Sequence, residues 1–264
     1  MISDSVLLFA TIYLQTGVLA ILLALTVNLI REDKNKPATV FLAFCYALWL
    51  FCDLYWVIYD LMQPDVRMPF AANEFGEAAT LLMAATTINS VSGLAVRRIR
   101  FVTVGALIFS CLNVALWIVW NGEWVQDIFF GAAFTWYLCS VADSMSENDA
   151  LSIRDWVVLG VICATVLICQ LLTFATGTEA GRIAEFAAYI AMAAGAAFLI
   201  WKFVVALRHK VAPEVLLALA FALVSWCTTF KYMSDGNWYT LFLLIEALGL
   251  PLWYVTLRKV VKQS

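Results

Sequence analysis

Residues 38–60 read ATVFLAFCYALWLFCDLYWVIYD, an apolar run that holds one acid, Asp53, before it ends at Asp60. An α-helix needs about 20 apolar residues to cross the ~30 Å hydrocarbon core of a bilayer, so this run predicts a membrane-spanning helix. A carboxylate within a span usually faces the bundle interior or a wet cavity, because exposing it to lipid costs ~2.5–3.5 kcal/mol at mid-helix. The stretch therefore predicts both the class of fold and a polar site inside it.

The composition of the whole chain agrees with this one run. Of its 264 residues, 64% are hydrophobic and 13% are charged, whereas soluble domains average about 45–50% and about 25%. No globular core could hide this excess, because much of the surface of a domain of this size stays wet. We therefore expect an all-α, polytopic transmembrane helix bundle that forms a single domain over residues 1–264.

Apolar runs of sufficient length recur along the chain. The first run lacks the basic segment and cleavage site of a signal peptide and is taken as the first span. We expect about nine spans. The connections NGEW and SDGNW are as short as tight turns, so the helices on either side could count as one span, which gives a range of seven to nine. The predicted spans cover residues 5–30, 38–60, 70–95, 101–120, 124–144, 156–176, 183–207, 213–233 and 238–258.

The charged residues predict the orientation of the bundle. Lys and Arg gather in cytoplasmic loops, and an outside N-terminus and inside C-terminus would put 13 of the 16 on the inner side. These are Arg31, Lys34, Lys36, Arg97, Arg98, Arg100, Arg154, Lys202, Arg208, Lys210, Arg258, Lys259 and Lys262. Acidic residues are concentrated in the predicted outer half, where they would attract cations. The alternative is that they lie there without a role, because the rule that places Lys and Arg in cytoplasmic loops does not act on acidic residues.

A weak internal repeat accompanies the spans. Four cysteines lie about 58 residues apart, each in the outer half of an ascending helix and each followed by a polar group; they are Cys52, Cys111, Cys169 and Cys227, followed by Asp53, Asn113, Gln170 and Thr228. This spacing fits one helical hairpin per repeat after an opening helix. If the repeat is real, the four polar groups converge on one region.

Asp53 is the first candidate binding residue. Trp56 follows it by three residues on one helix face, and Tyr55 lies beside it. A carboxylate among indole and phenol rings can hold a cation or an amine. The alternative is a buried acid satisfied by a hydroxyl group, with the rings forming an interfacial belt.

Further acidic residues lie near the starts of other helices that begin on the same predicted side of the membrane. Glu74 and Glu77 begin one helix, Asp127 and Glu185 occupy similar positions in two others, and Glu246 lies about two turns into the last. The helix macrodipole alone would explain acids at a helix start. If they face one cavity, they would form a cation site or a proton relay in which protonation is coupled to ligand occupancy.

Lys231 is the one lysine of the predicted outer half. Charges inside a membrane are usually paired, so Lys231 is expected to pair with Asp53 or Glu246. The alternative is that its side chain extends outward to the interface near Asp235. We treat Lys231 as a further member of the ligand-binding set.

The sequence offers little for catalysis. Its one histidine, His209, lies in the basic turn LRHK, which argues against a histidine-based zinc or haem site. Nucleophile-elbow and phosphate-loop motifs are missing, and the loops leave no room for a nucleic-acid-binding domain. We expect no enzyme activity, no metal, no cofactor and no nucleic-acid partner.

One segment, CDLYWVIYDLMQPDVRMPFAANEFGEAATLL at residues 52–82, resembles poorly characterised bacterial multi-span membrane proteins. It also resembles the membrane-embedded input regions of bacterial sensor kinases and cyclases. The resemblance implies a protein of the bacterial cytoplasmic membrane that senses or binds a small ligand. Since a fused output domain is lacking, it implies a separate signalling partner.

These observations support three hypotheses. The first is a sensor or receptor-like protein, surrounded by membrane lipid, that binds a small cationic ligand in an outward-facing acidic–aromatic pocket. The second is a proton- or cation-coupled secondary transporter that uses the same carboxylates. The third is a structural subunit without a ligand, in which case the carboxylates should be paired or should face lipid headgroups.

Overall fold

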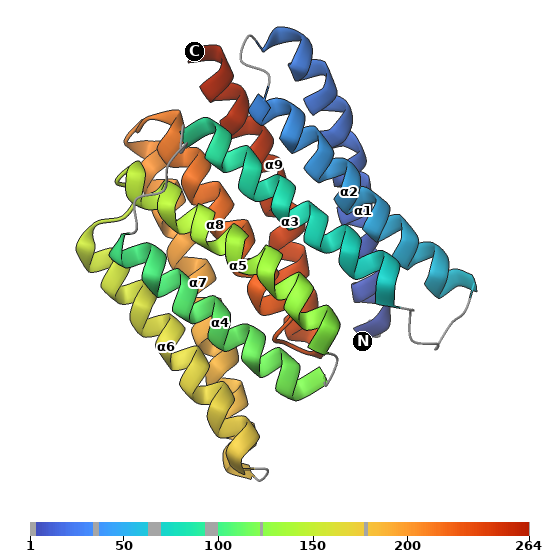
Figure 1. The fold of residues 1–264 in the computed structure, drawn as a ribbon, viewed down its shortest axis with the longest axis vertical. Coiled ribbons are helices and arrows are strands. Elements are labelled where there is room, and N and C mark those ends of the chain that lie inside the picture. The colour runs from blue at the N-terminus through green and yellow to red at the C-terminus, as the bar shows by residue number, and fades with distance from the viewer. Residues whose placement is uncertain are drawn as a thin grey trace.

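The protein is an all-helical bundle (Figure 1). The computed structural model describes residues 4–33, 37–62, 70–92, 100–121, 124–176 and 179–263, and within these ranges the chain forms nine helices and no strand. They are α1 (Asp4–Glu32), α2 (Pro37–Met62), α3 (Phe70–Ser92), α4 (Phe101–Asn121), α5 (Trp124–Glu147), α6 (Ile153–Thr176), α7 (Glu179–Arg208), α8 (Pro213–Lys231) and α9 (Gly236–Gln263). Each corresponds to one predicted span, so the predicted fold class is confirmed.

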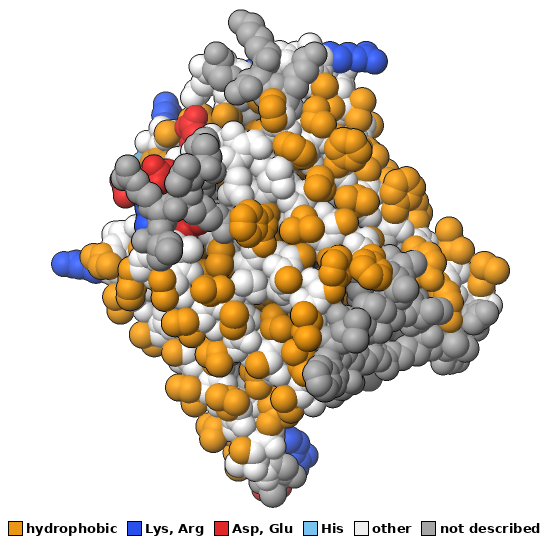
Figure 2. Space-filling view, in the orientation of Figure 1, with side chains coloured by type: hydrophobic (Ala, Val, Ile, Leu, Met, Phe, Trp, Pro, Cys, Tyr) orange, Lys and Arg blue, Asp and Glu red, His pale blue; other side chains and the backbone are white. Residues whose placement is uncertain are grey.

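Eight of the described helices are long and apolar enough to cross a membrane. The exception is α3, which carries Glu77, Thr80, Thr87 and Asn89 along its length. This helix packs between α2 and α5 and reaches α8, so protein covers much of its polar surface. Hydrophobic side chains cover the middle of the face shown in Figure 2, and charged side chains lie at its margins. The chain is a multi-pass integral membrane protein.

After α1, consecutive helices pack as four hairpins, α2–α3, α4–α5, α6–α7 and α8–α9. In each hairpin a glycine of the returning helix lets the two helices approach closely. A Cβ atom added at these glycines would come within 3.2 Å of a side chain on the partner helix; the pairs are Gly76 with Cys52, Gly131 with Val114, Gly181 with Thr176, and Gly249 with Val224. The predicted hairpin arrangement is therefore present.

The four regularly spaced cysteines are not equivalent. Cys52 and Cys227 are buried, Cys169 is half-buried and Cys111 is exposed. Gln170 lies on α6, which packs against α7 and α4, whereas Asp53 lies on α2, which packs against α1 and α3. The convergence of all four polar groups, which was predicted if the repeat is real, is therefore wrong, because α2 and α6 pack in different parts of the bundle.

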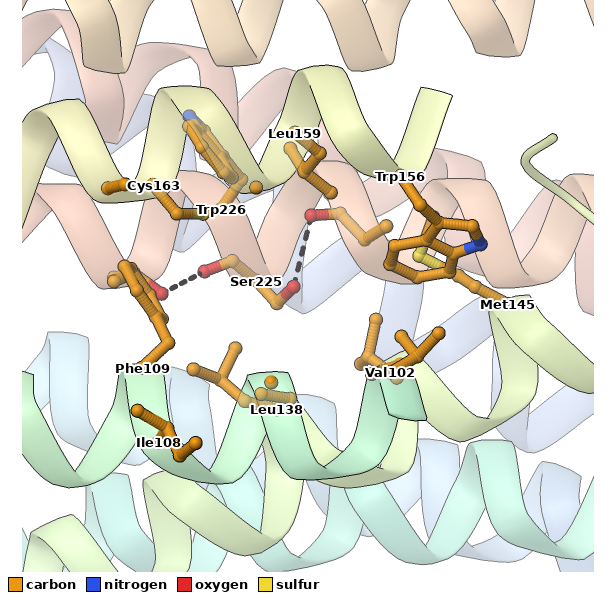
Figure 3. A pocket seen from close by; sticks show the side chains of 18 of the residues that line it. Val102, Ile108, Phe109, Leu138, Met145, Trp156, Leu159, Cys163, Ser225 and Trp226 are labelled. Carbon is orange, nitrogen blue, oxygen red and sulfur yellow. Dashed lines mark hydrogen bonds between the residues drawn. The ribbon is translucent and has the colours of Figure 1, made fainter. Parts of the chain in front are cut away.

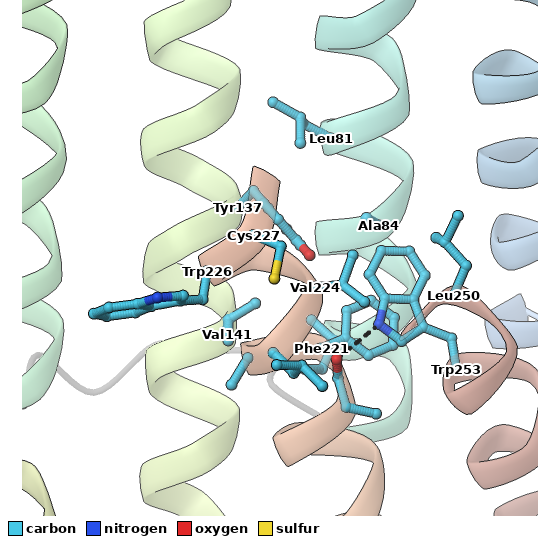
Figure 4. Close-up of a cluster of buried hydrophobic side chains, with 14 of the residues drawn as sticks. Leu81, Ala84, Tyr137, Val141, Phe221, Val224, Trp226, Cys227, Leu250 and Trp253 are labelled. Atoms are coloured by element: carbon cyan, nitrogen blue, oxygen red, sulfur yellow. Dashed lines mark hydrogen bonds between the residues drawn. The ribbon is translucent and has the colours of Figure 1, made fainter. Parts of the chain in front are cut away.

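Helix α8 is the centre of the bundle, buried along nearly its whole length among α3, α5, α7 and α9. Trp253 of α9 stacks on Phe221 with ring centroids 4.1 Å apart and donates its indole N–H to the Ala220 carbonyl at 3.1 Å (Figure 4). Trp226 of α8 donates to the Met192 carbonyl of α7 at 2.9 Å. These bonds satisfy the indole groups away from water and fix α7 and α9 against α8.

The connection from α5 to α6 is ordered by local hydrogen bonds. Asp149 adopts a positive φ of 48° just beyond α5, and the next amide, of Ala150, bonds back to the Met145 carbonyl at 2.9 Å, which closes the helix end. Ser152 and Asp155 then form a reciprocal capping box at the start of α6. Asp155 also pairs with Lys202 of α7 at 2.6 Å, which fixes the two helices to each other.

Gly195 of α7 gives a test of this packing. A Cβ atom at this position would overlap the ring of Trp226, whereas a Cβ at Gly17 of α1 would meet nothing within 4 Å. We expect Gly195→Ala to lower the free energy of unfolding by about 1–3 kcal/mol through overpacking, measured by thermal or denaturant unfolding in detergent. Gly17→Ala is the matched control, and equal stability of the two variants would contradict this account of the core.

Candidate functional site

A buried ion pair joins α8 to α9. Lys231 Nζ lies 2.9 Å from Glu246 Oε2, and the two side chains are only 7% and 0% exposed. Thr228 Oγ1 donates to Glu246 Oε1 at 2.6 Å, and Gln15 Nε2 of α1 lies 3.5 Å from Oε2. Lys231 thus pairs with Glu246, one of its two predicted partners, and the interfacial alternative for Lys231 is wrong.

The pair lies deep in the bundle. Glu246 follows the start of α9 at Gly236 by ten residues, which corresponds to ~15 Å at 1.5 Å per residue. Gln15 lies at a similar distance from the start of α1. Both helices begin on the predicted outer side, so Glu246 lies about three turns inside that end of α9, where a buried charge needs partners from the protein.

Two more carboxylates lie close to this pair. Glu77 Oε2 of α3 accepts a hydrogen bond from the Tyr232 hydroxyl at 2.7 Å. Asp53 of α2 interacts electrostatically with Lys231, Glu246 and Glu77, and its Oδ2 is buried without a hydrogen-bond partner. Asp53, Glu77, Lys231 and Glu246 are called the outer acid cluster below, and they bring together α2, α3, α8 and α9.

The rings beside the cluster differ from the predicted ones. Lys231 Nζ lies 5.8 Å from the ring centroid of Trp49 and 4.9 Å from that of Tyr232, distances at which a cation is attracted to a ring. The two predicted wall residues make other contacts. Trp56 packs against Phe9 of α1, and Tyr55 packs against Tyr59 within α2.

Of the remaining predicted site residues, Glu185 has a described side chain, and its hydrogen bond lies outside the cluster. Glu185 of α7 accepts a hydrogen bond from Tyr189 at 2.9 Å, and Tyr189 stacks on Trp238 with centroids 5.4 Å apart. This group is built from the starts of α7 and α9. Glu74 and Asp127 belong to α3 and α5, but their side chains lie outside the described residues.

Sequence reasoning missed two members of the polar network around Glu246. Gln15 is the one glutamine in the apolar run of α1, and Tyr232 directly follows Lys231. An uncharged polar side chain in a span carries a weak signal, because it costs much less in lipid than a charge does. The position of Gln15 well inside its span was the available clue.

A cavity of about 450 Å³ lies on another side of α8. Its walls come from α4, α5 and α6, and its floor from α8 (Figure 3). Ser225 and Thr229 supply hydroxyl groups to an otherwise apolar lining, and their hydroxyls bond to the α8 backbone. No member of the outer acid cluster lines this cavity, so it is not the predicted acidic–aromatic pocket. It is called the α4–α6 groove below.

Comparison of the chain with known proteins finds no matching protein-family model, no similar curated protein and no similar solved structure.

The ion pair predicts an asymmetric response to mutation. Lys231→Met leaves the Glu246 carboxylate buried without its counter-charge, and breaking a buried pair in this way costs ~3–5 kcal/mol. Adding Glu246→Gln should recover much of the loss, because it removes the uncompensated charge. Both effects are measured as unfolding free energies in detergent.

Lys202→Met is the control for this experiment, because its partner Asp155 lies near the end of the bundle and both side chains are more exposed than the central pair. A smaller loss is expected there. If Lys231→Met were no more harmful than Lys202→Met, the central pair would not be structurally important.

Proposed function

We propose that this protein is a proton- or cation-coupled secondary transporter of a small molecule, with the outer acid cluster as its coupling site. The observation that carries the proposal is that three carboxylates and one ammonium group, from four helices, interact electrostatically inside the bundle. This geometry suits a carrier better than an open receptor pocket, because Glu246 is fully buried and the predicted wall residue Trp56 packs elsewhere.

Charge balance supports ion coupling. Lys231 pairs with Glu246, and an ionised Asp53, whose buried Oδ2 has no hydrogen-bond partner, would add negative charge inside the bundle. Uncompensated charge in a medium of low polarity is costly, so the cluster favours the uptake of a proton or a small cation. Binding or release of that ion would change the strength of the Lys231–Glu246 attraction.

Helix α9 contains a feature suited to movement. Pro251 lies five residues after Glu246 inside the helix, and a proline there removes one backbone hydrogen bond and favours a kink. The preceding carbonyl, of Leu250, accepts a hydrogen bond from Tyr46 of α2 at 3.0 Å. The half-helix that carries Glu246 can therefore tilt about this point, as interrupted helices do in many transporters.

The structural-subunit hypothesis accounts for only part of the site. It explains Glu246, which is paired with Lys231, and Glu77, which is bonded to Tyr232. It does not explain Asp53, whose buried Oδ2 lacks a hydrogen-bond partner, because such a group destabilises a scaffold without serving it.

Asp53 also favours a second candidate function, a receptor-like protein for a small cationic ligand. Its unpartnered Oδ2 offers an acceptor in the outer half of α2, and Trp56 follows it by three residues in the same helix. The resemblance of residues 52–82 to bacterial sensor input regions supports the same proposal. A separate signalling partner would then read the occupancy of the site.

The coupling site is tested by charge displacement. Proteoliposomes on a solid-supported membrane are given a sodium jump or a pH jump, and the transient current is recorded. We expect a transient in the wild type, its loss in Glu246→Gln and a reduction in Asp53→Asn, which breaks no ion pair. Glu185→Gln, outside the cluster, should behave as the wild type; identical transients in all four proteins would contradict the proposal.

The same proteoliposomes separate the two candidate functions. Labelled choline, methylamine and a set of neutral metabolites are added with and without an ion gradient. Accumulation that depends on the gradient identifies a carrier, whereas saturable binding without accumulation identifies a receptor.

A further inference from the structure

The α4–α6 groove opens on the lipid-facing surface of the bundle. Its lining includes Phe101, Ile108 and Val157, which are among the exposed large apolar side chains. Its floor, by contrast, is made of buried α8 residues such as Trp226 and Phe230. The groove thus leads sideways from the membrane to the central helix (Figure 3).

Two glycines face the open space of this groove. Gly105 of α4 and Gly160 of α6 both line it, and a Cβ atom added at either would meet nothing within 4 Å. This distinguishes them from Gly76, Gly195 and Gly249, whose missing side chains allow direct contact with a neighbouring helix. Gly105 and Gly160 therefore widen the groove and do not bring α4 and α6 together.

The groove has the depth and the chemistry of a hydrocarbon site. Along α6 its lining runs from Ile153 to Leu167, which is ~21 Å at 1.5 Å per residue and exceeds the ~15 Å of one leaflet. Arg154 is exposed at the start of α6 and Trp156 lines the same end. Both residue types gather at the level of lipid headgroups.

We propose that the α4–α6 groove binds one acyl chain of a phospholipid, which enters sideways from the bilayer with its headgroup near Arg154 and Trp156. The chain would lie between Gly105 and Gly160 and reach the α8 floor at Ser225, Trp226 and Thr229. This site is separate from the outer acid cluster, and the proposal does not depend on the proposed transport function.

Contact with α8 distinguishes a lipid bound in the groove from lipid that only surrounds the protein. Trp226 and Ser225 line the groove and are only 7% and 4% exposed, so a chain reaches them through the groove and not from the outer surface. A lipid held against α8 should also stabilise the bundle, because a ligand that binds only the folded state shifts the unfolding equilibrium.

The test uses a phospholipid that carries a photoactivatable diazirine near the end of one acyl chain. The protein is reconstituted with it, irradiated, and mapped by mass spectrometry. We expect labelled peptides from the α8 floor, Ser225 to Phe230, in addition to the lipid-facing surface. Gly160→Leu and Gly105→Leu fill the groove and should lose both the α8 labelling and the stabilisation by added phospholipid, while keeping the surface labelling and the melting temperature in lipid-free detergent.

Gly17→Leu is the matched control, because Gly17 is equally open but lies on α1 outside the groove, and it should keep the α8 labelling. Labelling confined to exposed residues in the wild type, or α8 labelling that persists in both groove variants, would overturn the proposal. So would α8 labelling by a free diazirine fatty acid but not by the phospholipid.

Discussion

The Lys231–Glu246 pair constrains the arrangement of the helices around it. Water is scarce at this depth, so the ammonium and the carboxylate must find their partners in the protein. Glu246 obtains them from Lys231 and Thr228 of α8 and from Gln15 of α1. These contacts fix the register of α9 against α8 and hold α1 beside them, and the remaining helices pack around this fixed group.

The second constraint is the burial of α8. A helix enclosed by α3, α5, α7 and α9 is buried along nearly its whole length, so its polar groups must be satisfied mainly by neighbours in the protein. The indole N–H of Trp226 donates a hydrogen bond to α7, and the carbonyl of Ala220 accepts one from α9, so both groups meet this condition. The same helix presents Lys231 to the acid cluster and Ser225 to the α4–α6 groove.

Hydropathy was sufficient to predict eight of the described helices as spans, because the bilayer sets one length for every crossing helix. Hydropathy was not sufficient to predict that α8 is central. Lipid and a protein core are equally apolar, so the sequence of a central helix has the same hydropathy as that of a lipid-facing one. The spacing of charges drew attention to Asp53, Glu77, Lys231 and Glu246 as candidates. Their meeting also required the rotation of each helix, which tertiary packing decides.

The same limit applies to the other candidates. Trp56 shares a face of α2 with Asp53, and the sequence did not indicate that α1 approaches this side of the helix, where Phe9 contacts the Trp56 ring. Trp49, four residues before Asp53, lies beside Lys231. Glu185 enters its helix as Glu77 does, yet α7 carries it to the start of α9 and to Tyr189. Helical periodicity therefore gives the relative positions of residues on one helix, but not the neighbour that each face meets.

The position of α8 between the cluster and the groove restricts how the bundle can move. Displacing α8 alone would break the Trp226 bond to α7 and the Trp253 bond to Ala220 at once, leaving buried donors unsatisfied at a cost of about 1–3 kcal/mol each. A rearrangement that keeps both bonds carries α7, α8 and α9 together. Motion of the α4–α5 pair against the α7–α9 unit would also keep both bonds. That motion would change the width of the α4–α6 groove.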